Sequence, residues 1–208
     1  MQWYKIISLS ALAVCFIALL IQVIKIMKLG TPADYSARAG STRSGIAYSF
    51  TGAMAPTKKE SALRHLPLYI AGVLYHAGTF LAALLWVLFT SGVTLSSTIA
   101  TATAFVMAAA LLSGVVLLVK RVATEASRSL STPDDYISNL LVTLFQLFTF
   151  LLLYGLQVVT TYYLISAILL LYLPVGKLRH MIWFFAARYH LGYFFGYRGT
   201  WPPEKRER

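Results

Sequence analysis

Residues 68–89 carry no Asp, Glu, Lys or Arg and contain a single histidine, His76. A run of about twenty predominantly apolar residues is the length at which an α-helix crosses the hydrocarbon core of a bilayer. We therefore expect this stretch to be a transmembrane helix. An imidazole is a costly side chain to place inside a bilayer, so His76 is a candidate functional residue by its position alone.

Apolar stretches of this kind recur along the whole chain. Hydrophobic residues make up 58% of its 208 positions and charged residues only 12%, whereas soluble domains carry roughly 25% charged residues. We predict an all-α integral membrane protein with a single polytopic domain over residues 1–208. Its five expected spans are residues 4–26, 68–89, 97–119, 137–155 and 158–176.

The last two spans come from forty residues, 137–176, that have no formal charge. This stretch is too long for one span and fits a hairpin of two that turns near Gly155. Pro174 is expected to bend the second of them. Just before the stretch, residues 132–135 (Thr-Pro-Asp-Asp) have the pattern of a helix N-terminus, with a capping hydroxyl, a first-turn proline and acids that the helix dipole favours.

The distribution of positive charge predicts the orientation of the chain. Lys and Arg gather in two expected loops, residues 27–67 and 120–136, and in the C-terminal tail 177–208, while only Lys5 falls on the other side. By the positive-inside rule these three segments are cytoplasmic and the N-terminus is outside. The tail is aromatic and basic, which favours an amphipathic helix at the lipid surface or a docking surface for a cytoplasmic subunit. This topology explains the net charge of +11, and nucleic-acid binding is not expected.

Several classes of function are disfavoured by what the sequence lacks. It contains no nucleotide-binding or nucleophile motif. Apart from Lys5 and Lys25 near the two ends of the first span, no span contains an acidic or basic residue, so the charged residues that line ion pathways in transporters are missing. The one cysteine, Cys15, cannot form an intrachain disulfide or a cysteine-based metal site. No catalytic acid, base or nucleophile is therefore predicted on this chain.

The histidines remain as the residues that can carry chemistry. All four are expected in the cytoplasmic half of the protein or beyond it: His65, His76, His180 and His190. Neutral imidazoles from two helices near one membrane face can fill both axial positions of haem b. The alternative is histidines that hydrogen-bond to Ser, Thr or carbonyl groups. His190, in the tail, is interpreted as an interfacial side chain or a partner contact.

Three motifs, in this order, resemble the cytochrome b family typified by the gamma subunit of respiratory nitrate reductase. They are Leu-Tyr-His-Ala-Gly at 74–78, Leu-Leu-Val-Lys-Arg at 117–121 leading to the acids 134–135, and residues 173–180, which end at His180. Residues 54–61 and 195–199 look closer to one branch of that family. The branch comprises membrane subunits of redox complexes in sulfate-reducing bacteria, which join periplasmic cytochromes c to cytoplasmic iron–sulfur proteins.

The resemblance implies a haem between spans 2 and 5, with His76 and His180 as the axial ligands of its iron. A second, outer haem would take ligands near Trp86 and Tyr162, and neither side chain can serve as an imidazole ligand. One haem b is therefore expected rather than two. Judged only by depth in the membrane, His65 is at the same level as His180. His76 lies eleven residues beyond His65, which is about 16 Å deeper along an ideal helix. The pair His65–His180 stays open as an alternative.

The expected function is that of a membrane-anchoring cytochrome b subunit in a multi-subunit respiratory complex of the bacterial inner membrane. By this resemblance it transfers electrons between the quinone pool, with menaquinone as the candidate, or a periplasmic cytochrome c and a cytoplasmic iron–sulfur subunit. It is then a non-catalytic electron-transfer subunit of an oxidoreductase complex. The alternative is a haem-free membrane anchor for such a complex.

Overall fold

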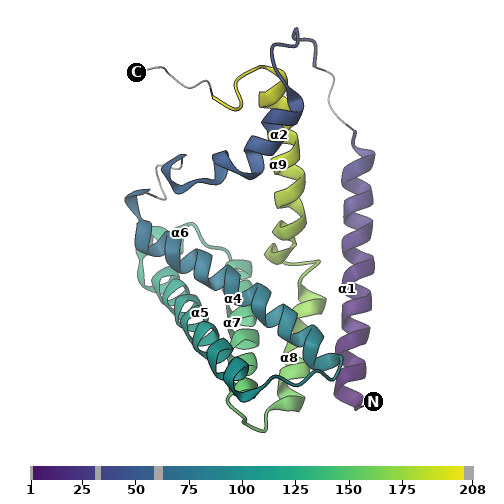
Figure 1. Cartoon of the computed structure of the whole chain (residues 1–208), viewed down its shortest axis with the longest axis vertical. Helices are drawn as coiled ribbons and strands as arrows, with labels where there is room; N and C mark the ends of the chain where they lie inside the picture. The colour runs from purple at the N-terminus through teal and green to yellow at the C-terminus, as the bar shows by residue number, and fades with distance from the viewer. Residues whose placement is uncertain (1, 31–33, 59–62, 204–208) are drawn as a thin grey trace. The chain divides into compact units, whose positions relative to one another are not determined.

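The computed structural model describes residues 2–30, 34–58 and 63–203, and these contain helices and no β-strand (Figure 1). The α-helices are α1 (Trp3–Lys28), α2 (Thr42–Phe50), α4 (Leu66–Thr90), α5 (Ser97–Ala123), α6 (Glu125–Ser129), α7 (Pro133–Leu153), α8 (Val159–Tyr172) and α9 (His180–Tyr197). Three short 3₁₀ turns, η1 (Gly52–Met54), η2 (Pro56–Lys58) and η3 (Lys177–Arg179), complete the described elements. Parts of the expected loop 27–67 (31–33 and 59–62) and of the expected tail (204–208) lie outside the described residues.

Four of the described helices, α1, α4, α5 and α7, are long and apolar enough to cross a membrane. A fifth span is obtained only if α8 is counted together with the helix that follows the break at 173–176. Alone, the 14 residues of α8 extend for about 21 Å, which is less than the roughly 30 Å of a hydrocarbon core. The prediction of an all-helical chain with several membrane-length helices is confirmed for the described residues, and the stretch expected as the fifth span, 158–176, ends as a regular helix at Tyr172.

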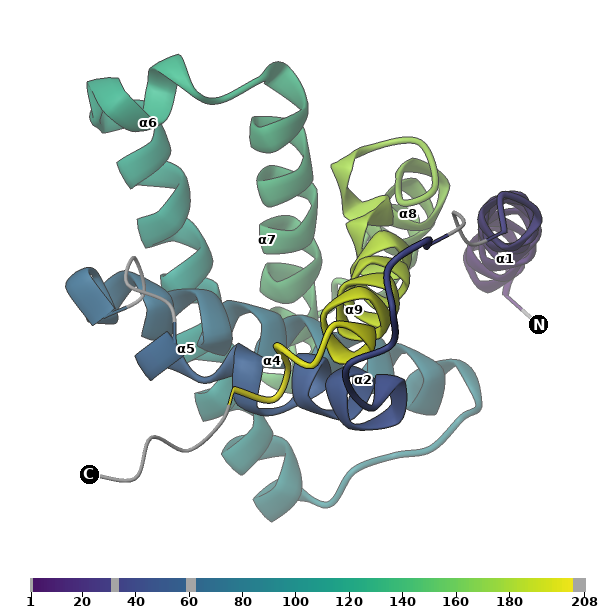
Figure 2. The ribbon, with the colours of Figure 1, turned by 90° about the horizontal axis from the view of Figure 1, so that it is seen from above.

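The chain forms two compact units. The first unit comprises Met1–Ala18 and Pro67–Leu178, and the second comprises Leu19–Leu66 and Arg179–Arg208. Within the first unit, α5 and α7 run side by side and are connected through α6 (Figure 2). Helix α4 packs on both. A Cβ on Gly78 of α4 would collide with the Cβ of Ala110 on α5 and would lie 3.4 Å from Nε2 of Gln146 on α7.

Local sequence signals account for the ends of α7. Thr132 is its N-cap residue and Pro133 occupies the first turn, as the sequence predicted. In addition, the Thr132 N–H donates to Asp135 Oδ2 at 3.0 Å and so forms a capping box. The helix ends at Leu153, and Gly155 in the turn to α8 has φ +87°, a conformation that glycine adopts without steric cost.

In the second unit, α2 packs closely along α9 (Figure 1). Small residues allow this approach, since a Cβ on Gly192 of α9 would lie 2.5 Å from the Cα of Ile46 and a Cβ on Gly196 would lie 2.9 Å from the Cα of Gly45. The Ser49 hydroxyl donates to the Arg188 carbonyl at 2.8 Å. The expected loop 27–67 therefore contains a helix that is held by its partner α9.

The segment before α2 is tied to the end of α9 by an ion pair. Arg198 contacts Asp34 with both terminal nitrogens, at 2.6 and 3.1 Å, and its guanidinium lies 3.7 Å from the centre of the Phe194 ring. Two hydrogen bonds from Ser36, together with the charge of Arg198, lower the pKa of Asp34. The carboxylate therefore stays ionised to lower pH in the folded chain, and its pairing weakens as the pH falls through that lowered pKa.

Candidate functional site

His76 lies on α4, and its imidazole is exposed. Its Nδ1 is 2.7 Å from the carbonyl oxygen of Gly72, one helical turn earlier. Because a carbonyl oxygen only accepts, Nδ1 is the donor in this contact, and Nε2 is the ring nitrogen that could bind a metal. This is how metal-ligating histidines are usually held, with one nitrogen donating to a carbonyl and the other directed at the metal.

The two faces of α4 differ in their surroundings. Gly78 and Ala82 are buried, whereas Val73 and Phe80, which share the face of His76, are 52% and 69% exposed. A Cβ added at Gly72 would meet nothing within 4 Å. The imidazole thus stands on an apolar strip of α4 that the rest of the first unit leaves uncovered, and a flat apolar group can approach the helix there.

Polar contacts to α7 fix the rotation of α4 beside His76. The Tyr75 hydroxyl donates to the Asn139 carbonyl at 2.9 Å, and the Tyr75 carbonyl accepts from Gln146 Nε2 at 2.9 Å. Gln146 is fully buried, so this hydrogen bond is shielded from water. Since Tyr75 and His76 are neighbours on one helix, anchoring the tyrosine toward α7 directs the imidazole away from the core.

The other three histidines belong to the second unit, and all three side chains are exposed. His180 is the first residue of α9 and follows η3. His65 lies in the turn before α4, and His190 lies on α9, where it lines a mostly apolar cavity of about 520 Å³ with residues of α1 and α9. Within the described ranges no three His, Cys, Asp or Glu side chains gather as a metal site. A haem held by two axial imidazoles needs only two such side chains, so this finding does not bear on it.

Trp86 and Tyr162, at the positions where an outer haem would need ligands, are both core residues of the first unit. Trp86 Nε1 donates to the hydroxyls of Ser8 and Ser166 at 3.1 and 3.0 Å, and these two serines are 2.8 Å apart. Because Ser8 is on α1 and Ser166 on α8, this buried group of three polar side chains joins three helices. The sequence analysis did not foresee it, and a serine in each of two apolar helices was its only signal.

Tyr162 is fully buried, and its ring stacks on Phe145 with centroids 5.9 Å apart. Met107 and Ala82 are likewise inaccessible in the same cluster. This part of the first unit is therefore closed to solvent by packed side chains, and a macrocycle could enter it only by displacing them.

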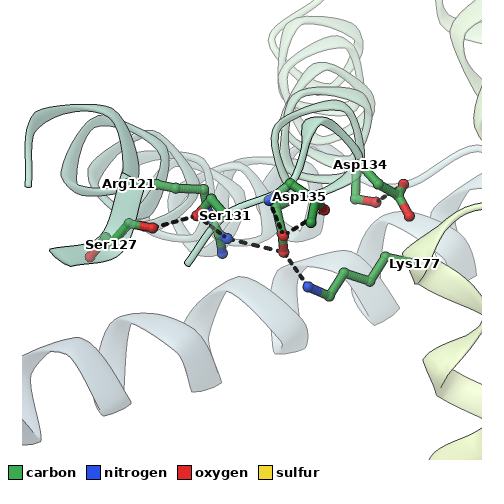
Figure 3. Close-up of polar contacts among 8 residues, drawn as sticks. Arg121, Ser127, Ser131, Asp134, Asp135 and Lys177 are labelled. Carbon is green, nitrogen blue, oxygen red and sulfur yellow. Dashed lines mark hydrogen bonds and ion pairs between the residues drawn. The ribbon is translucent and has the colours of Figure 1, made fainter. Parts of the chain in front are cut away.

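An ion-pair cluster joins three segments of the first unit (Figure 3). Asp135, near the start of α7, is 3.0 Å from Arg121 Nη1 at the end of α5 and 2.5 Å from Lys177 Nζ at the start of η3. Arg121 Nη1 also donates to the Ser131 hydroxyl at 3.1 Å. Two of the three motifs quoted above thus meet here, a contact that the sequence analysis did not predict.

No protein family model, curated protein or solved structure matches this chain. Its function is therefore inferred from the chain's own residues.

Proposed function

We propose that this chain is the membrane-anchoring cytochrome b subunit of a multi-subunit respiratory redox complex. The observation that carries the proposal is the arrangement at His76. An imidazole stands on an exposed, apolar face of a membrane-length helix, with Nδ1 held by the Gly72 carbonyl and Nε2 as the other ring nitrogen. A histidine that only satisfies its ring on the helix would make the same contact, so it is the place of the imidazole on an exposed apolar face that favours a ligand.

The proposed ligands of the haem iron are His76 and His180. Both side chains are exposed, and the neutral imidazole is a common ligand of haem iron. When bound, the haem supplies reversible one-electron chemistry, while the chain contributes axial ligation and an apolar setting that tunes the potential. The open strip around Gly72, Val73 and Phe80 supports this assignment, because it offers apolar surface beside the imidazole.

One haem per chain is proposed rather than two. The volume around Trp86 and Tyr162 is occupied by packed aromatic side chains, and the Trp86 indole is already engaged by two serine hydroxyls. A second haem would have to break these hydrogen bonds and open a cavity in a closed core, and it would find no imidazole there.

The surroundings of the proposed complex follow from the charge of the chain. The second unit contains thirteen of the eighteen Lys and Arg residues and four of the seven acids. Under the positive-inside rule it lies at the cytoplasmic face of a bacterial inner membrane, with the N-terminus outside. There it would meet a cytoplasmic iron–sulfur subunit, and electrons would be exchanged with menaquinone in the bilayer or with a periplasmic cytochrome c.

The test is a reduced-minus-oxidised absorption spectrum of the purified full-length chain, produced with haem supplied. We expect b-type bands and a haem content of about one per chain, because two imidazoles complete one iron. A helical, monodisperse protein without these bands would favour the alternative, a haem-free anchor for a redox complex. A content of two per chain would contradict the closed outer core.

A further inference from the structure

The cluster of Arg121, Asp135 and Lys177 has one member, Lys177, that lies close in sequence to the proposed ligand His180. Lys177 is the first residue of η3, and His180 follows it by three residues. We propose that Asp135 is a positioning residue for the turn η3, which leads directly into His180, because it holds the chain at Lys177 from the ends of two other helices. This inference rests on the proposed function and names how one of its ligands is held.

Both oxygens of the Asp135 carboxylate are fully engaged. Oδ2 accepts from the N–H and the hydroxyl of Thr132, each at 3.0 Å. Oδ1 accepts from Arg121 Nη1 at 3.0 Å and from Lys177 Nζ at 2.5 Å. One side chain therefore joins the end of α5, the N-terminus of α7 and the start of η3 (Figure 3).

The members of the cluster differ in exposure. The Asp135 side chain is 6% exposed, whereas that of Lys177 is 57% exposed. A carboxylate removed from water is stable as an anion only with donors and cations around it. A half-exposed ammonium, in contrast, recovers hydration when it loses its partner. The cluster therefore depends on the carboxylate, and its neutral isostere Asn is expected to release Lys177.

Packing restricts the chain on either side of Lys177. Pro174 is buried and fixes its own φ, and Gly176 is buried with the Tyr172 ring where a Cβ would otherwise lie. Leu178 packs against the core of the first unit. The Asp135–Lys177 pair adds a polar tie to this restrained segment, so the residue that leads into the turn before His180 is fixed in position.

The experiment compares Asp135→Asn with Asp134→Asn in the full-length protein as purified. Asp134 is the matched control, because it is adjacent, loses the same charge, and has a 3.3 Å hydrogen bond from Ser138 in place of the ion pairs. We expect amide hydrogen exchange over residues 177–181 to be about tenfold faster in Asp135→Asn, as loss of a charge-assisted bond permits, and unchanged in Asp134→Asn.

The second readout is the electron paramagnetic resonance spectrum of the oxidised haem, which depends on the mutual orientation of the two imidazole planes. Asp135→Asn is expected to shift or broaden the low-spin signal, while Asp134→Asn, with the same change of charge, keeps it. Lys177→Arg preserves the pairing with Asp135 and is expected to retain both the spectrum and the slow exchange. A merely electrostatic effect would move the signal in both Asn variants.

Unchanged exchange and an unchanged signal in Asp135→Asn, with haem present in the unaltered protein, would overturn the positioning role and leave the proposed function intact. If Asp135→Asn does not fold, Lys177→Met decides the question, because it removes the tie and leaves Asp135 with Arg121 and Thr132. Slow exchange over 177–181 in that variant would overturn the inference. Absence of haem from the unaltered protein would instead refute the proposed function itself.

Discussion

Replacing His76 with alanine is expected to remove haem from the purified chain, and His180→Ala is expected to do the same. Each substitution deletes one of two protein bonds to the iron. Even loss of a residue that only orients a metal ligand costs 10–100-fold in affinity. The affinity for haem should therefore fall at least about tenfold, and the haem content of the purified chain should fall with it. The measurement is haem per chain in the purified variants, with helical content followed by circular dichroism.

Two other histidines provide matched controls. His65→Ala and His190→Ala remove the same side chain from exposed positions and are expected to keep haem at the level of the unaltered protein. The informative contrary result is loss of haem in His65→Ala with retention in His76→Ala. It would show that depth in the membrane selects the ligand, and it would leave the Gly72 hydrogen bond of His76 as a purely structural contact.

The reason to favour His76 over His65 is the state of its ring. Among the described residues no hydrogen bond of the His65 ring is present, whereas His76 Nδ1 is 2.7 Å from a carbonyl oxygen. A ring held through Nδ1 loses less entropy on ligation, because the direction of Nε2 is already restricted. This advantage does not depend on how deep the imidazole lies.

The membrane helices could be predicted from the sequence because hydropathy is a local signal. The expected span 68–89 corresponds to α4 (Leu66–Thr90), and the N-cap at Thr132 is defined by four consecutive residues. Helix α2 could not be predicted in this way. Its nine residues have little apolar periodicity, and its stability comes from backbone contact with Gly192 and Gly196, nearly 150 positions further on.

In the candidate site, too, the local features could be predicted from the sequence and the long-range contacts could not. The position of His76 within an apolar stretch was evident, and its contact with Gly72 spans a single helical turn. The partners of Asp135 were not evident, because 42 residues separate it from Lys177. Trp86 was recognised only as a residue unable to bind iron, and the hydroxyls of Ser8 and Ser166 give it a structural role in joining helices.

Gly192→Ala is expected to separate α2 from α9. The new Cβ would lie 2.5 Å from the Cα of Ile46 and 2.8 Å from the carbonyl oxygen of Gly45. These are backbone atoms, which cannot rotate away as a side chain would, so the two helices must move apart. Overpacking of this kind costs about 1–3 kcal/mol, and amide exchange in α2 should accelerate by roughly 5- to 150-fold.

Gly72→Ala is the control for the intrinsic effect of the substitution. It also lies inside a helix, but its Cβ would meet nothing within 4 Å, so it should stabilise α4 by about 0.5–1 kcal/mol. Helix α9 has two roles, since it carries the proposed ligand His180 and it packs on α2. Gly192 lies twelve residues beyond His180, about 18 Å along an ideal helix, so haem content distinguishes the two roles. Gly192→Ala should therefore expose α2 while keeping haem, and unchanged protection of α2 would show that the glycine contact is dispensable.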